Sequence, residues 1–279
     1  MGKRVFSSTL LWAIVIATMY FLHNTGAIIL CALVSMLTLG EFYRLMRASG
    51  FTPFARLGTA FGGIITLGPV IQLKLGFPSE LLLPLATIVF SVRLLGERTP
   101  ENRMESLCST LFGLVYVSLL LQYFVRIVLP MPGDAISPDG RLMLCLWVIA
   151  ATKFCDMGGL LTGLAIGRHK MSPQISPKKT WEGAVGGVLA SIGIGAALAW
   201  FGRDVIHVLP ATMTPWIGAA MAAPIGILGI VGDLIESVIK RRANMKDSAS
   251  IIPSMGGFFD MSDSLILTAP VGYYLIGLL

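Results

Sequence analysis

The sequence predicts an all-α integral membrane protein of about nine transmembrane helices. Of its 279 residues, 55% are hydrophobic and 13% are charged, and the mean hydropathy is +0.79. A soluble domain carries about 25% charged residues. Apolar runs of about 17–25 residues, long enough to cross a bilayer as a helix, recur along the whole chain. We therefore expect no separate soluble domain.

The expected spans follow one another with short connections. They cover residues 8–23, 27–43, 57–73, 80–95, 107–130, 141–166, 182–202, 212–238 and 264–279. The first has a basic start, MGKR, but no small-residue cleavage site follows it, so a membrane helix is favoured over a signal peptide. We expect one membrane unit, with helices for packing and dimerisation in residues 1–140 and the active site in residues 141–279.

The basic residues predict the orientation of the chain. With the N-terminus in the cytoplasm, sixteen of the 21 Lys and Arg residues fall on the cytoplasmic side. The exceptions are Lys74, Arg126, Arg141 and Arg203 on the other side and Lys153 inside a span. Cytoplasmic loops carry the excess of Lys and Arg, so we expect a cytoplasmic N-terminus and a C-terminus on the opposite side.

The polar chemistry gathers in two loops, 167–181 and 239–263, which this orientation places on the cytoplasmic face. Seven of the fifteen acidic residues lie in these loops or in the spans beside them: Asp156, Glu182, Asp233, Glu236, Asp247, Asp260 and Asp263. Acidic residues contribute little to topology, so this grouping indicates function.

The net charge of +6 fits the loop bias and does not call for a nucleic-acid partner. The four cysteines form no CxxC pair, which argues against a zinc site or a disulfide framework.

The first polar loop contains the run SPKKTWEG. Ser176 and Pro177 predict a helix start, with Ser at the N-cap and Pro at the first helical position. Lys178 and Lys179 would then lie in the first turn, where unpaired backbone amides already favour anions. The loop is a candidate phosphate cradle, and the alternative is a basic loop that serves topology alone.

Asp156 lies inside a predicted span, where a carboxylate is costly and usually functional. Lys153 is three residues earlier on the same helical face and can pair with it, so a purely structural ion pair is the alternative. Glycines 159, 163 and 167 follow the small-xxx-small spacing of close helix packing.

The second polar loop ends on a pair of carboxylates. Asp260 and Asp263 are three residues apart at the predicted start of the last helix, and Gly256 and Gly257 provide a tight turn before them. With Asp247 they form a candidate Mg²⁺ site, since Mg²⁺ is held by one or two carboxylates plus substrate phosphates. Helix capping is the alternative. Upstream, Asp233, Glu236 and Lys240 share one helical face, where the alternative is a surface salt bridge.

Residues 237–263 resemble the signature of phosphatidate cytidylyltransferases, also called CDP-diacylglycerol synthases. The matching positions run in register without a gap: Ser237, Lys240, Arg241, Lys246, Asp247, Ala249, Pro253, Gly256, Gly257, Asp260 and Asp263. The run SPKKTWEG, the span of Asp156 and the run GDLIES from Gly232 also resemble conserved blocks of that family. The resemblance covers about residues 156–279.

Three positions depart from the signature. Met255 stands where the family has His, Met261 where it has Arg, and Ser262 where it has an apolar residue or Thr. No His or Arg role is therefore carried over, and we expect activity to survive because the carboxylates and lysines remain.

The resemblance implies that CTP and phosphatidate react with Mg²⁺ to give CDP-diacylglycerol and pyrophosphate. It implies an inner (cytoplasmic) membrane enzyme of phospholipid biosynthesis whose active site faces the cytoplasm, and a homodimer. The implied metal ligands are Asp260, Asp263 and Asp247. The implied catalytic residues are Lys178, Lys179, Lys240, Arg241, Lys246 and Asp247. The implied substrate-binding residues are Ser176, Thr180, Glu182, Asp156, Asp233, Ser237, Gly256 and Gly257. The number of metals, including a second, monovalent ion, stays open.

Two other functions remain open. A cytidylyltransferase or kinase acting on another lipid phosphate or an isoprenoid would use similar residues. A secondary transporter would explain the intramembrane Asp156–Lys153 pair but not the carboxylates grouped at a loop and helix start. The DG-x2-AR pattern of a CDP-alcohol phosphotransferase is missing from the sequence.

Overall fold

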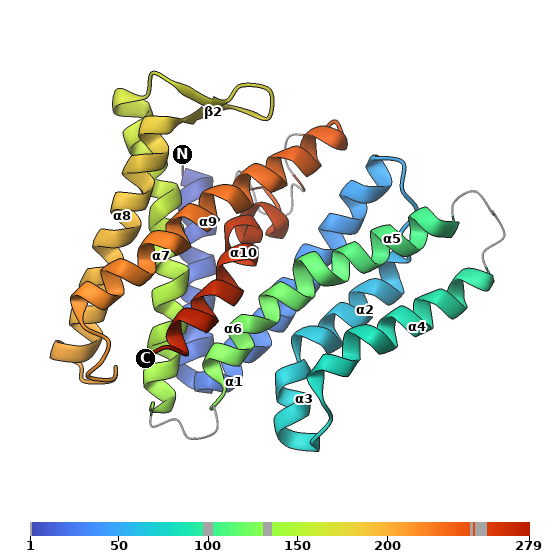
Figure 1. Ribbon diagram of the computed structural model, residues 1–279, viewed down its shortest axis with the longest axis horizontal. Helices are drawn as coiled ribbons and strands as arrows, with labels where there is room; N and C mark the ends of the chain where they lie inside the picture. The colour runs from blue at the N-terminus through green and yellow to red at the C-terminus, as the bar shows by residue number, and fades with distance from the viewer. Residues whose placement is uncertain (1, 97–102, 131–135, 246–247, 249–255) are drawn as a thin grey trace. The chain divides into compact units, whose positions relative to one another are not determined.

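The computed structural model describes residues 2–96, 103–130, 136–245, 248 and 256–279. It is built almost entirely of helices (Figure 1). The α-helices are α1 (Gly2–Ala48), α2 (Ala55–Thr66), α3 (Gly68–Leu75), α4 (Leu82–Leu95), α5 (Arg103–Gly113), α6 (Leu120–Val128), α7 (Pro138–Ile166), α8 (Trp181–Trp200), α9 (Pro215–Arg242) and α10 (Phe258–Ile276). Shorter helical turns are η1 (Ser79–Leu81), η3 (Leu114–Leu119) and η4 (Phe201–Val205).

The all-α membrane class is confirmed. Each predicted span falls on described helix, and the first two share α1, which loses helical geometry at His23 (φ 46°, ψ −131°). Within the described residues, five helical runs are long and apolar enough to cross a membrane, and six if the bent pair α2–α3 counts as one span. The last predicted helix begins at Phe258, so Asp260 lies in its first turn, as expected.

The predicted helix start at Ser176 and Pro177 is wrong. Residues Lys170–Ser172 (β1) and Ser176–Thr180 (β2) form an antiparallel hairpin, which Figure 1 shows at the N-terminal end of α8. The helix begins four residues later, where Thr180 is the N-cap and its side chain accepts a hydrogen bond of 3.1 Å from the Gly183 amide. Two candidate caps compete here, and the strand pairing of Ser172 with Ser176 keeps the first in extended backbone.

The chain forms two compact units. Unit 1 comprises Met1–Val125 and Ile239–Ser262, and unit 2 comprises Arg126–Val238 and Asp263–Leu279. In unit 1 the buried ring of Phe42 lies 5.8 Å from Phe112 and 5.9 Å from Phe259, between ring centroids. Because Phe259 belongs to the first turn of α10, this aromatic core fixes the start of that helix within unit 1.

In unit 2 the close packing of α7 on α8 depends on glycine, as the small-xxx-small spacing predicts. A Cβ atom on Gly183 would lie 2.7 Å from the carbonyl oxygen of Gly159, and one on Gly158 would lie 2.4 Å from the Cβ atom of Ala190 before either helix shifted. Trp147 adds a hydrogen bond of 2.8 Å from its indole nitrogen to the carbonyl oxygen of Gly195. The short interaxial distance brings Asp156 of α7 near the hairpin that precedes α8.

Candidate active site

Unit 2 contains a cavity of about 510 Å³ between α7, α8, the hairpin and α9. Its polar lining consists of Asp156, Lys170, Lys178, Lys179, Thr180 and Asp233. Its apolar lining includes Leu160 and Leu164 of α7, which are otherwise largely exposed. The cavity thus combines three cations, two carboxylates and an apolar wall, a combination suited to a ligand with both phosphate and hydrocarbon parts.

The hairpin supplies the cations of this cavity. Lys179 reaches from β2 to α9, with its Nζ atom 2.7 Å from Oδ2 of Asp233 and 3.2 Å from the carbonyl oxygen of Ile230. Lys178 lines the same cavity and is exposed. The two lysines therefore adjoin the cavity from a strand, not from a helix terminus.

Two predicted substrate-binding residues hold this hairpin in place. Thr180 caps α8, and Glu182 accepts hydrogen bonds from the backbone amides of Arg168 (3.1 Å) and His169 (3.2 Å). The carboxylate of Glu182 also lies 2.5 Å from Nδ1 of His169. Glu182 therefore ties the loop after α7 to the start of α8, and Thr180 joins β2 to that helix.

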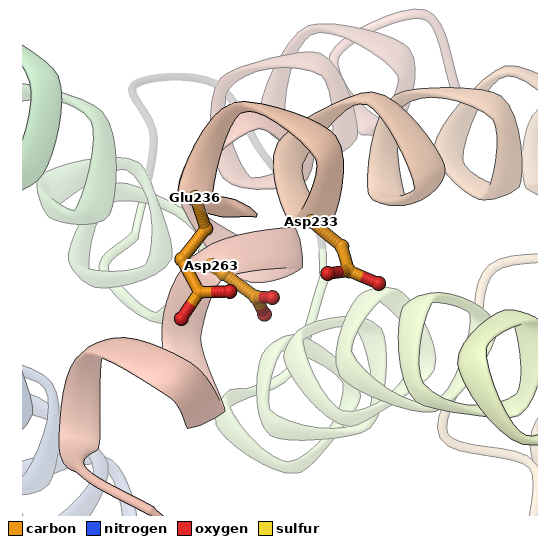
Figure 2. A group of neighbouring side chains, drawn as sticks. All are labelled: Asp233, Glu236 and Asp263. Carbon is orange, nitrogen blue, oxygen red and sulfur yellow. The ribbon is translucent and has the colours of Figure 1, made fainter. Parts of the chain in front are cut away.

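Three carboxylates meet beside the cavity. Asp233 and Glu236 of α9 and Asp263 of α10 each offer an oxygen atom within 4.8 Å of the others, and Figure 2 shows the side chains converging on one space. Glu236 is 2% exposed and Asp263 is 6% exposed. Gly232 permits the approach of the two helices, because a Cβ atom there would lie 2.6 Å from the carbonyl oxygen of Asp263. Grouped buried carboxylates of one sign repel each other, and a divalent cation relieves that repulsion.

The predicted pairing of Lys153 with Asp156 is confirmed and extends to this cluster. The Lys153 Nζ atom lies 3.4 Å from Asp156, 3.8 Å from Asp263 and 2.8 Å from the hydroxyl of Ser264. Ser264 in turn donates a hydrogen bond of 3.0 Å to Asp156. Asp156 is thus linked to the acidic cluster through one cation and one hydroxyl.

A second polar network lies within unit 1, around Asp260. Its carboxylate lies 2.8 Å from Nζ of Lys240 and accepts hydrogen bonds from the amides of Ser248 (3.0 Å) and Gly257 (2.7 Å). Gly256 has φ +88°, a left-handed conformation that glycine adopts without strain. The glycine pair thus shapes a turn whose amide donates to Asp260.

The remaining predicted site residues are not brought into either polar network by a described contact. Lys246 and Asp247 lie outside the described residues. Arg241 is exposed on α9, Ser237 is half-buried on the same helix, and Ser176 begins β2. The roles predicted for these residues stay predictions.

The sequence interpretation did not single out Glu236 as a site residue. Its spacing from Lys240 indicated a surface salt bridge, but its side chain is buried. The available signal was the run GDLIES, in which Asp233 and Glu236 are three residues apart and share a helical face.

Comparison with known proteins agrees with the resemblance of the signature. A sequence model of the cytidylyltransferase family matches residues 2–279. A phosphatidate cytidylyltransferase of Synechocystis sp. is 31% identical, over 89% of this chain and 87% of its own length. A phosphatidate cytidylyltransferase of Chlamydia trachomatis is 29% identical, over 98% of this chain and 92% of its own length. Phosphatidate cytidylyltransferase 5, chloroplastic, of Arabidopsis thaliana is 31% identical, over 87% of this chain and 64% of its own length.

Proposed function

The chain belongs to the cytidylyltransferase family, and we propose that it transfers the cytidylyl group of CTP to phosphatidate. A phosphate oxygen of phosphatidate attacks the α-phosphorus of CTP, the bond from that phosphorus to the bridging oxygen breaks, and pyrophosphate leaves. The products are CDP-diacylglycerol and pyrophosphate. The single observation that carries this proposal is the cavity of unit 2, where Lys178 and Lys179 lie beside Asp233 of the acidic cluster.

Asp233, Glu236 and Asp263 fit a divalent cation, because each offers a carboxylate oxygen close to the others in a largely buried place. Hard oxygen ligands of this kind suit Mg²⁺. When bound there, Mg²⁺ would neutralise phosphate charge as pyrophosphate departs. This set shares Asp263 with the ligands predicted from the sequence and replaces Asp260 and Asp247 by two residues of α9.

The other residues of the cavity position and neutralise the substrates. Lys178 and Lys179 bring positive charge to the phosphates, which is the main contribution that a protein makes to phosphoryl transfer. Thr180 and Glu182 keep the hairpin against α8, and the apolar wall of α7 admits the lipid. The ammonium group of Lys153 lies near both Asp156 and Asp263 and reduces the repulsion between their carboxylates.

The defining experiment uses the purified full chain in detergent with CTP, phosphatidate and Mg²⁺. We expect CDP-diacylglycerol and pyrophosphate in equal amounts. Replacing phosphatidate with a polyprenyl phosphate tests the alternative lipid substrates. A folded protein that forms no product with phosphatidate would reject the proposal.

Removing the cation of Lys179 is expected to weaken CTP binding. In Lys179→Ala the KM for CTP should rise by about tenfold, the loss expected for a charge-assisted hydrogen bond of about 1.5 kcal/mol. Steady-state kinetics with varied CTP measure this change. Lys74→Ala, on α3 outside the cavity, serves as the control. An unchanged CTP dependence in Lys179→Ala would assign the hairpin lysines to topology alone.

The placement in the membrane is also part of the proposal. From the charge bias we infer nine spans, a cytoplasmic N-terminus and a C-terminus on the opposite side of the inner membrane. From the resemblance we infer an active site open to the cytoplasm and a homodimer. We expect a phosphatase fused after Leu279 to be active in the periplasm of a bacterial host. A cytoplasmic C-terminus would contradict the nine-span topology.

A further inference from the structure

Two charged residues of α1 contact the segment that carries the signature. Glu41 is 4% exposed, and its Oε2 atom accepts hydrogen bonds from the hydroxyl of Ser248 (2.8 Å) and the amide of Phe259 (2.9 Å). Arg44, one helical turn later, donates a hydrogen bond to the carbonyl oxygen of Ser248. All of these residues belong to unit 1.

Ser248 is held at each of its polar atoms. It is fully buried, its amide donates to Asp260, and its hydroxyl lies 2.9 Å from Oδ2 of Asp260 as well as beside Glu41. Its carbonyl accepts from Arg44.

The contact of Glu41 explains the second glycine of the signature turn. A Cβ atom on Gly257 would collide with Oε2 of Glu41 and Oγ of Ser248. The amide of Gly257 donates to Asp260 in this same space. Position 257 of the turn therefore has no side chain, and the Glu41 carboxylate of α1 occupies that space.

Packing alone does not account for Glu41. Burying a carboxylate costs free energy unless its oxygens are paired, and apolar residues of similar volume fill such places at no such cost. Among the described residues, the Oε1 atom of Glu41 is buried and has no hydrogen-bond partner. The cost of burying the Glu41 carboxylate is offset by its two hydrogen bonds, from Ser248 and Phe259, and these bonds order the start of α10.

We propose that Glu41, with Arg44, is a positioning residue that holds Ser248 and the first turn of α10, and through them directs Asp260 toward Lys240. This gives an N-terminal helix a part in the reaction, beyond packing. The expected effect on the reaction rests on the proposed function. The ordering of Ser248 and the first turn of α10 by Glu41 does not.

The test compares Glu41→Leu, Glu41→Gln and Ser248→Ala in the full-length protein. The amide oxygen of glutamine can accept both bonds, whereas leucine can accept neither. We expect kcat to fall by about tenfold or more in Glu41→Leu and Ser248→Ala, with the KM for CTP within about twofold, and to stay within about threefold in Glu41→Gln. The double variant should be no slower than the slower single variant, because both substitutions remove the same link.

Hydrogen exchange by mass spectrometry separates this inference from the proposed function. Peptides covering residues 256–262 should exchange faster in Glu41→Leu and Ser248→Ala but not in Glu41→Gln. Ser35 lies on α1 with Glu41, and its buried hydroxyl is bonded to Thr66 of α2; Ser35→Ala should change neither this exchange nor kcat. Unchanged exchange in both Glu41→Leu and Ser248→Ala would overturn the inference. Lack of CDP-diacylglycerol with wild-type protein, while exchange responds as stated, would reject only the proposed function.

Discussion

Asp263→Asn is expected to lower kcat by about a hundredfold or more, since metal ligands and their supporting groups are worth at least about 10–100-fold in affinity or activity. Asparagine keeps the shape of the side chain and removes its charge, so the cluster with Asp233 and Glu236 loses attraction for a divalent cation. The apparent Mg²⁺ requirement should rise together with the loss of kcat. Initial rates measured over a series of Mg²⁺ concentrations test both effects.

Two comparisons make this prediction specific. Asp139→Asn carries the same substitution at an exposed carboxylate in the first turn of α7 and should leave rate and Mg²⁺ dependence unchanged. Asp260→Asn should lower kcat without changing the Mg²⁺ requirement, because Asp260 pairs with Lys240 and accepts hydrogen bonds from the amides of Ser248 and Gly257 and from the Ser248 hydroxyl. If Asp260→Asn raises the Mg²⁺ requirement as Asp263→Asn does, the ligand set predicted from the sequence, which also contains Asp263, is the better one.

Local sequence patterns were sufficient for the helices and for pairs within one helix. Apolar runs predict each span because only a helix satisfies its backbone polar groups inside a bilayer. The spacing of three residues predicts the approach of Lys153 to Asp156, which is confirmed at 3.4 Å. Both predictions depend on interactions between residues close in the sequence.

The contacts that were missed join distant segments. Glu41 reaches Phe259 across 218 residues, and nothing in the pattern around Glu41 indicates that partner. The acidic cluster depends on how α9 meets α10 at Gly232, which sets whether Asp260 or Asp263 faces Glu236. The hairpin was missed because Ser176 and Thr180 are both good caps, and the tertiary pairing with β1 selects the second.

Gly257→Ala is expected to lower kcat by about 10–100-fold and to reduce the thermal midpoint by several degrees. The new methyl group would occupy the space of the Glu41 carboxylate and the Ser248 hydroxyl, and overpacking of this kind costs about 1–3 kcal/mol. Either the carboxylate withdraws, which breaks its bond to the Phe259 amide, or the turn moves, which breaks the Gly257 amide's bond to Asp260. Steady-state kinetics and thermal unfolding in detergent measure the two effects.

Gly40→Ala is the matched control, because it makes the same substitution one residue before Glu41 on an exposed face of α1. A Cβ atom there meets nothing within 4 Å, and alanine stabilises a helix relative to glycine by about 1 kcal/mol, so stability should rise slightly and kcat should not change. Glu41→Asp combined with Gly257→Ala shortens the carboxylate that the methyl group meets and should recover part of the thermal midpoint. A Gly257→Ala protein with wild-type kcat would show that the turn tolerates a side chain, and that Glu41 does not constrain the position of Asp260.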